Sequence, residues 1–178
     1  MAIRRPPSLK VRALQWLAQR EHSRAELREK LLRLAHAPLQ GVGDGLAPDD
    51  ALAVDAAAAA IAPEQEVDTL LAWLEARGYL SDTRFVESRV ATRAPRFGNL
   101  RIENELRQRG VELDTDIRQS LRDTELQRAR DVWQRRYGAQ TPADPAARVR
   151  QMRFLAGRGF SAEVVRQVLR TGTSTDDE

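Results

Sequence analysis

The sequence predicts an all-α protein built as a tandem array of helices. One pattern, L-x-x-R-G followed by a hydrophobic residue and, three positions later, an acidic one, occurs as LEARGYLSD, LRQRGVELD and LAGRGFSAE. Elsewhere, apolar residues recur at the three- and four-residue spacing of amphipathic helices, and no stretch is a convincing strand. An internal repeat in a helical chain is typical of stacked helical modules.

Each copy of the pattern predicts a sharp helix ending. A glycine just past a helix takes the left-handed conformation that closes a Schellman motif, and hydrophobic residues on its two sides contact each other. The predicted contacts pair Leu74 with Tyr79, Leu106 with Val111, and Leu155 with Phe160. Another helix follows each corner almost at once, and its candidate N-caps are Ser81, Asp114 and Ser161.

The first 80 residues predict three helices and an alanine-rich insertion. Apolar spacing gives a helix over 9–20, and the capping box SRAE opens a second helix that ends before Pro38. An alanine-rich helix is expected over 48–61, after a loop rich in glycine, proline and aspartate. Pro63 then occupies the first turn of the helix that ends at the first corner.

About nine helices are expected beside the alanine-rich one, and they group in threes. The later helices are expected over 82–93, 99–109, 114–121, 126–137, 145–158 and 161–170. The predicted organisation is a flexible basic tail over 1–8, three modules over 9–80, 81–122 and 123–170, and a disordered acidic tail over 171–178. The first module contains the acidic insertion over 38–62.

Composition excludes several classes of protein. The 178 residues include no cysteine, and no apolar run reaches the roughly 18 residues that a membrane span requires. The chain starts without an apolar signal core, so a cytoplasmic location is expected. Two isolated histidines do not form a metal site at a recognised spacing, and no catalytic constellation appears. We therefore expect no enzyme activity, no metal and no cofactor.

Charge is strongly segregated along the chain. No lysine or arginine lies between Arg33 and Arg77, an interval with eight acidic residues, and the last three residues are acidic. The rest of the chain contains 29 basic residues, 27 of them arginine, and only 15 acidic ones. Because guanidinium groups bind phosphate and carboxylate in bidentate fashion, this excess favours an anionic partner, either nucleic acid or an acidic protein groove.

Ten arginines are candidate contacts with such a partner, chosen by charge and predicted helical face. They are Arg20, Arg24, Arg28, Arg93, Arg96, Arg101, Arg135, Arg136, Arg150 and Arg153. The last two are placed opposite an apolar side of their helix formed by Val149 and Met152. A sequence-specific DNA reader is disfavoured, because the helices after the corners carry acidic residues in their first turn, where phosphate is repelled.

Four segments resemble the RecX family, the regulators of the RecA recombinase. They are QREHSRAELREKL, LEARGYLSDTRFVESRV, FGNLRIENELRQRGV and FLAGRGFSAEVVRQVL. The resemblance implies tandem three-helix modules in an elongated, curved molecule that lies in the groove of the RecA–DNA filament. It also implies inhibition of the RecA ATPase, of strand exchange in DNA recombination and repair, and of SOS signalling. The chain departs from the family in its long insertion over 38–62.

Two other functions remain open from the sequence. One is a general DNA-binding helical protein, for which the segregated arginines would contact phosphates directly. The other is a helical scaffold for protein interactions, without a nucleic-acid role. For the RecA regulator, the expected partner is the RecA filament, with single- or double-stranded DNA as a further contact, and neither a membrane nor a small-molecule substrate is expected.

Overall fold

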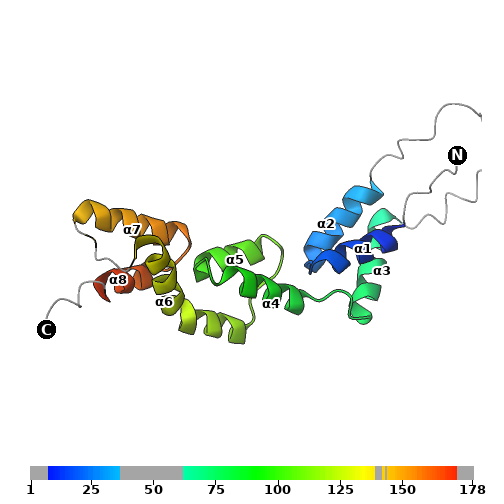
Figure 1. Cartoon of the computed structure of the whole chain (residues 1–178). Coiled ribbons are helices and arrows are strands. Elements are labelled where there is room, and N and C mark those ends of the chain that lie inside the picture. Colours follow the sequence, from blue (N-terminus) through cyan, green and yellow to red (C-terminus); the bar gives the residue numbers. More distant parts are fainter. Residues whose placement is uncertain (1–7, 37–61, 139–141, 143, 172–178) are drawn as a thin grey trace, which may run out of the picture. The chain divides into compact units, whose positions relative to one another are not determined.

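The computed structural model describes residues 8–36, 62–138, 142 and 144–171. These residues form eight α-helices and no strand, which confirms the predicted all-α fold (Figure 1). The alanine-rich helix expected over 48–61 and almost all of both expected tails lie outside the described residues. The chain divides into two compact units, Met1–Asp82 and Thr83–Glu178.

The first unit contains three helices that begin and end close to where the sequence predicts. They are α1 (Leu9–Gln19), α2 (Arg24–Ala35) and α3 (Pro63–Ala76). The Ser23 side chain accepts a hydrogen bond from the N–H of Glu26 at 3.1 Å, so Ser23 is the N-cap of α2 as predicted. The helices enclose one apolar core formed by Ala13, Leu27, Leu31, Val67, Leu71, Leu74 and Leu80.

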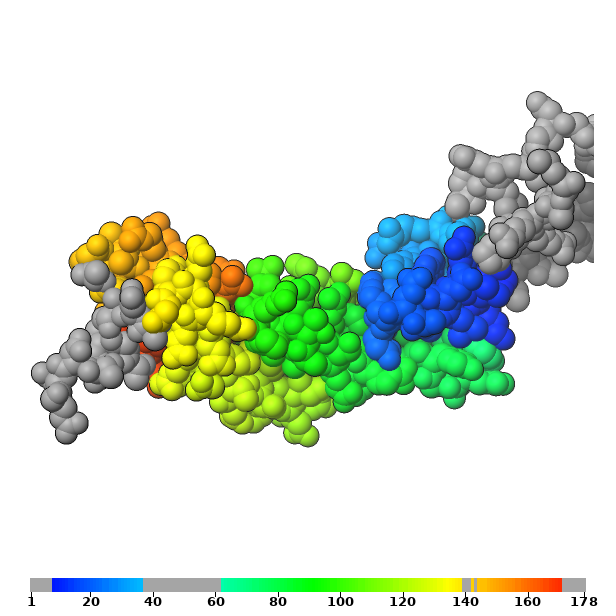
Figure 2. All heavy atoms as spheres, viewed as in Figure 1, coloured from blue at the N-terminus to red at the C-terminus, as the bar shows by residue number. Residues whose placement is uncertain are grey.

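The second unit contains five helices around two apolar cores. The helices are α4 (Asp82–Arg93), whose first residue ends the first unit, α5 (Asn99–Arg107), α6 (Thr115–Tyr137), α7 (Pro145–Gly157) and α8 (Ala162–Thr171). One core is shared by α4, α5 and the start of α6, and the other by the rest of α6 with α7 and α8. In Figure 2 the yellow atoms of α6 lie between the green atoms of α4 and α5 and the orange atoms of α7.

The sequence predicts two helices where the structure has the single 23-residue helix α6. The prediction of nine helices is therefore wrong for the described residues, because no glycine or proline interrupts the polar stretch between Leu121 and Leu126. This stretch has a structural task of its own. Glu125 is only 5% exposed, and its carboxylate accepts hydrogen bonds from the N–H groups of Asn99 at 3.1 Å and Ser161 at 3.3 Å.

The three predicted helix endings are confirmed. Gly78, Gly110 and Gly159 have positive φ angles of 71°, 71° and 82°. In each corner the residue after the glycine donates its N–H to the carbonyl of the leucine five positions earlier. The glycine itself donates to the carbonyl three positions earlier, and all six bonds measure 2.9 to 3.3 Å. This pair of bonds defines the Schellman motif.

The first corner differs from the other two in its hydrophobic residue. Val111 and Phe160 are buried in the same cores as their leucines, as predicted. Tyr79 instead is 49% exposed and stacks on Trp73, with the ring centroids 5.9 Å apart. Leu80 enters the core in its place. Tyr79 thus stays at the surface of the corner, because leucine fills an apolar site without having to satisfy a buried hydroxyl.

Two glycines let the α4–α5 connection touch the α7–α8 corner. The N–H of Gly98 donates to the carbonyl of Arg158 at 3.0 Å, and the N–H of Leu100 donates to that of Gly159 at 3.1 Å. A methyl group on Gly98 would lie 2.2 Å from the Gly159 oxygen, and one on Gly159 would lie 2.5 Å from Cβ of Arg101. The two connections can therefore meet only because neither glycine has a side chain.

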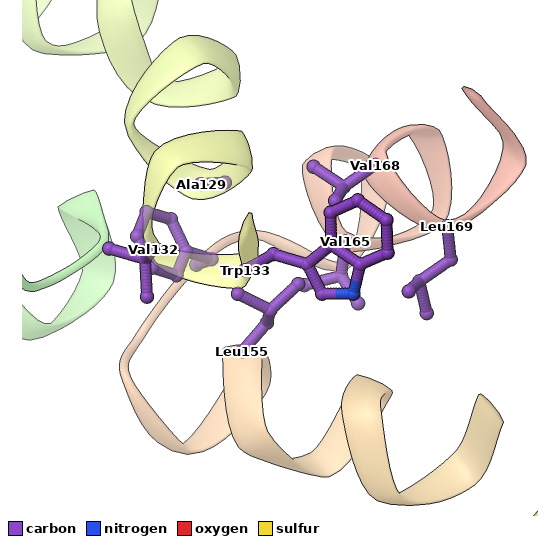
Figure 3. Packing of buried hydrophobic residues seen from close by; sticks show 8 residues of the cluster. Ala129, Val132, Trp133, Leu155, Val165, Val168 and Leu169 are labelled. Atoms are coloured by element: carbon purple, nitrogen blue, oxygen red, sulfur yellow. The ribbon is translucent and has the colours of Figure 1, made fainter. Parts of the chain in front are cut away.

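Trp133 is central to the core of α6, α7 and α8. Its ring lies among Leu155, Val165 and Leu169 (Figure 3), and it is 4% exposed. The indole N–H donates to the Gln151 side chain at 2.7 Å, which satisfies the polar atom of each residue inside the protein. The hydrogen bond explains why a glutamine is buried on α7.

The inward side of α7 is not the side formed by Val149 and Met152. Gln151 and Leu155 are buried, whereas Val149 is 43% and Met152 37% exposed. The apolar side formed by Val149 and Met152 is therefore not the buried one, and Gln151, which accepts the hydrogen bond from Trp133, faces the core instead.

Candidate binding surface

A basic hollow lies on the surface of the second unit. Its volume is about 440 Å³, and its lining, here called the arginine groove, combines four arginines with three apolar residues. The lining consists of Arg96, Phe97, Val132, Arg135, Arg136, Phe154 and Arg158. No carboxylate of the described residues contributes to this lining, so the groove concentrates positive charge in a concave site.

Three segments far apart in the sequence build the arginine groove. The connection between α4 and α5 supplies Arg96 and Phe97, while the end of α7 supplies Phe154 and Arg158. The hydrogen bond from the N–H of Gly98 to the carbonyl of Arg158 joins these two segments. The C-terminal half of α6 supplies the remaining residues, so the groove exists only once the corners are in contact.

Two of the groove arginines, Arg135 and Arg158, are oriented by carbonyls and a ring rather than by carboxylates. Arg135 donates from Nη2 to the carbonyl of Pro95 at 2.7 Å and from Nε to that of Asp131 at 3.1 Å. The Arg158 guanidinium lies 4.5 Å from the ring centroid of Phe154. Within the described part of the chain, none of the four groove arginines forms an ion pair. Their full charges therefore remain for a ligand.

One half-buried arginine of α6 fixes the α4–α5 connection. Arg128 donates from Nη1 to the carbonyls of Ala94 at 3.1 Å and Phe97 at 2.9 Å. Its Nη2 donates to the side-chain oxygen of Asn99 at 2.6 Å. Burial lowers the pKa of Arg128, and the nearby negative charge of Glu125 opposes this effect. The role of Arg128 is to position one wall of the groove, and the sequence does not reveal it.

The three candidate arginines of the first unit are paired with carboxylates. The pairs are Arg20 with Glu26, Arg24 with Glu75, and Arg28 with Asp68. The last pair is bidentate, with hydrogen bonds of 2.7 and 3.0 Å. The hydrogen bond from Arg28 lowers the pKa of Asp68, which keeps that carboxylate ionised. Each of these arginines would have to exchange an internal partner for an external one.

Two further candidates, Arg93 and Arg101, share the carboxylate of Glu105 at 2.8 and 3.3 Å. Arg150 and Arg153 are exposed on α7 but do not line the groove. Of the ten predicted contacts, the structure thus brings Arg96, Arg135 and Arg136 together in one site.

Sequence reasoning missed Arg158 and the two phenylalanines of the arginine groove. Arg158 is the C-cap of α7, and it stands in the repeated corner pattern, where its position suggests only a helix-ending role. Phe97 and Phe154 look like ordinary core residues at helical spacing. A signal was present in the segment PRFGN, where an arginine and an aromatic residue precede the glycine of the close contact.

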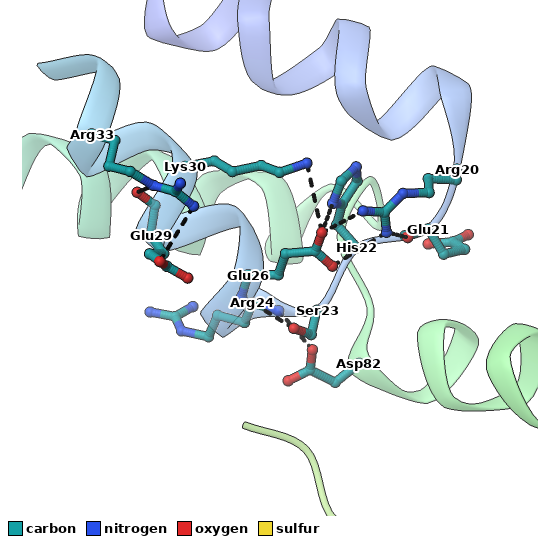
Figure 4. A network of polar contacts seen from close by, with 10 residues as sticks. All are labelled: Arg20, Glu21, His22, Ser23, Arg24, Glu26, Glu29, Lys30, Arg33 and Asp82. Carbon is teal, nitrogen blue, oxygen red and sulfur yellow. Dashed lines mark hydrogen bonds and ion pairs between the residues drawn. The ribbon is translucent and has the colours of Figure 1, made fainter. Parts of the chain in front are cut away.

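A buried carboxylate organises the charged residues near the start of α2 (Figure 4). Glu26 is 8% exposed and contacts Arg20, Nδ1 of His22 at 3.2 Å and Nζ of Lys30 at 3.6 Å. His22 is 2% exposed. Its burial and the positive charge of Arg20 lower the pKa of His22 below its ordinary value of 6.5, although Glu26 acts in the opposite direction. The imidazole is therefore neutral in the folded protein at neutral pH.

Acidification should destabilise the protein through His22. As the pH falls through 6.5, the unfolded chain binds a proton at this residue before the folded chain does. The unfolded state then binds more protons, so stability is lost as the pH falls below that value. Urea unfolding of the wild type and His22→Gln should be compared at about pH 7.5 and about pH 5.5, and the variant should lose less stability between the two. An equal loss in both proteins would assign the acid sensitivity to other groups.

The fold and the groove together define a class of protein, an all-α chain of tandem helical corners with a basic concave surface. Within the described residues no group of three or more histidine, aspartate or glutamate side chains could hold a metal ion, and no described helix could span a membrane. Residues 81–122 match the family model of the second three-helix domain of RecX, and residues 123–169 match that of the third. The boundary between the two matches falls inside α6.

Similar proteins extend the match to almost the whole chain. The chain is 47% identical to the regulatory protein RecX of Leptothrix cholodnii, over 99% of this chain and 98% of that protein. It is 40% identical to the regulatory protein RecX of Ralstonia pickettii, with 93% and 89% covered, and 36% identical to that of Pseudomonas putida, with 97% and 95% covered. The chain belongs to the RecX family.

Proposed function

We propose that this chain is a non-enzymatic negative regulator of RecA that binds the RecA–DNA filament in its groove in the cytoplasm. The observation that carries the proposal is the nearly full-length identity of 47% to a protein named regulatory protein RecX. The arginine groove supports it, since unpaired guanidinium groups in a concave site suit a large anionic assembly. Bound in this way, the chain would inhibit ATP hydrolysis, strand exchange and SOS signalling.

The proposed regulator works through binding alone. A protein that makes no covalent change can shift a filament only if it binds one state of the filament more tightly than another. A chain seated in the filament groove has this property if the groove changes shape between states, because its contacts are then made fully in one state only. The elongated, curved body expected from the family resemblance suits such a position and stays a prediction.

Three modules over 9–80, 81–122 and 123–170 are part of the proposal. The three separate apolar cores support this division, since each is formed by three successive helical segments. Separate cores allow each module to contact a different RecA subunit along the filament. The continuous α6 would connect the second and third modules without a hinge, so these two would engage the filament as one piece.

The decisive experiment is the ATPase activity of RecA on single-stranded DNA. The protein, added at a small fraction of the RecA concentration, should inhibit hydrolysis, because one bound molecule limits the growth of a whole filament. Absence of inhibition by a demonstrably folded protein would remove the proposal.

A general DNA-binding protein is the second candidate, favoured by the same arginine groove. It would inhibit RecA only by covering the DNA, which requires enough protein to occupy most of the strand. Titration at two DNA concentrations separates the candidates. For a filament regulator, the protein concentration that gives half-inhibition should scale with the concentration of RecA filaments. For a DNA competitor, it should scale with the total nucleotide concentration.

A further inference from the structure

We infer that the arginine groove binds the phosphodiester backbone of nucleic acid directly and without sequence preference. The inference deepens the proposed function, on which its biological setting rests, by assigning DNA contact to the second unit. Four guanidinium groups from three separate segments converge on one hollow of about 440 Å³. Such convergence concentrates cationic hydrogen-bond donors on a single ligand, whereas arginines spread over wet helix faces do not.

Phosphate oxygens match the donors that the groove presents. Arg135 is held by the carbonyls of Pro95 and Asp131, and both bonds leave other N–H groups of the guanidinium available. Arg96 and Arg136 are exposed lining residues of the hollow, and neither forms an ion pair within the described residues. Carbonyl oxygens orient an arginine without neutralising it, so the site keeps its affinity for an anion.

The aromatic residues of the groove do not offer stacking surfaces to bases. The guanidinium of Arg101 lies 4.2 Å from the ring centroid of Phe97, and that of Arg158 lies 4.5 Å from that of Phe154. The edge contact between Phe154 and Tyr137, at 5.4 Å, covers a further part of that ring. Single-strand binders that stack bases need free ring faces. Here the rings support arginines, and backbone contacts carry no sequence information.

An acidic protein segment fits the groove less well than a phosphodiester chain. Peptide recognition usually combines charge pairs with pockets for apolar side chains. Val132 is 5% exposed, and Phe97 and Phe154 are half-buried beside guanidinium groups, so none of the three apolar residues of the groove is fully exposed to a peptide side chain. In the first unit, by contrast, three arginines are already bound by carboxylates of the same chain.

The test uses the full chain with DNA alone, so that its result does not depend on RecA. Fluorescence anisotropy would measure binding of labelled oligodeoxythymidine, and of a duplex of equal length, over a range of salt concentrations. Arg96→Gln combined with Arg136→Gln should weaken binding at least about tenfold and reduce the slope of log affinity against log salt by about 1.4 on the single strand. Whether the duplex responds in the same way tells which form of nucleic acid supplies the phosphates.

The matched control is Arg122→Gln combined with Arg166→Gln, two exposed arginines of the second unit outside the groove. This variant loses the same charge and should weaken binding less than threefold. Equal losses in both variants, no loss in either, or no DNA binding by the wild type would overturn the inference. The inference would also be overturned if polyglutamate displaced the DNA from the groove when both are present at the same concentration of negative charge. Circular dichroism would verify that both variants keep wild-type helix content.

RecA assays on the same variants separate the two proposals. A wild type that binds DNA through the groove without inhibiting RecA keeps this inference and removes the proposed function. Inhibition of RecA that survives loss of DNA binding in the groove variant keeps both, and shows that the filament is held mainly through protein contacts.

Discussion

Replacing Gly98 with alanine should destabilise the second unit by about 3 kcal/mol, at the upper end of what overpacking a buried site costs. The new methyl carbon would lie 2.2 to 2.3 Å from backbone atoms of Gly159 and Phe160. Backbone atoms cannot move aside as the end of a flexible side chain can. The two connections would have to separate, which breaks the hydrogen bonds from Gly98 and Leu100. Thermal unfolding followed by circular dichroism should show a midpoint lower by roughly 10 °C.

Gly78→Ala is the control for the Gly98 variant. Gly78 has a φ of 71°, but an added methyl group would meet nothing within 4 Å. The expected cost is only the strain of a left-handed alanine, about 1 kcal/mol. If Gly78→Ala proves as damaging as Gly98→Ala, the contact between the connections is not what Gly98 is needed for. Because Arg96 and Arg158 lie on the two sides of this contact, Gly98→Ala should also weaken DNA binding.

Local signals account for the parts of the fold that were predicted correctly. The caps Ser23 and Asp114 and the corner glycines act within a few residues of the chain, so their patterns are visible in sequence. The exposure of Tyr79 and the buried side of α7 are not visible in the sequence. In both cases the outcome depends on a partner, Trp73 or Trp133, and on the choice between a buried hydroxyl and an apolar side chain.

The binding surface could be predicted only in part, because ion pairing depends on residues far away in the sequence. In the sequence, nothing distinguishes Arg24 and Arg28 from Arg96. The carboxylates that pair with Arg24 and Arg28 lie 51 and 40 positions further along the chain. Charge excess correctly indicates an arginine-rich surface. It does not distinguish arginines that are already compensated from those that converge on the arginine groove.

Replacing Glu125 with alanine should destabilise the second unit by about 3 kcal/mol, because several buried donors lose their acceptor together. One carboxylate oxygen accepts from the N–H of Asn99, the first residue of α5, where Gly98 provides no side-chain cap. The same oxygen accepts from the N–H of Ser161 just before α8, and the other accepts from the Ser161 hydroxyl at 3.3 Å. A single negative charge thus faces the positive ends of two helix dipoles.

Hydrogen exchange would show where the Glu125→Ala variant is weakened. Amides of α5 and α8 should lose protection, while those of α2 in the first unit should not change. Glu125→Gln keeps the shape and one acceptor but loses the charge, and should cost about 1 kcal/mol. Asp123→Ala removes an exposed carboxylate from the same helix, one bonded to the Gln119 side chain, and should change stability by less than about 0.5 kcal/mol. Unchanged protection of α5 and α8 in Glu125→Ala would mean that packing alone, without this shared cap, holds α5 and α8 against α6.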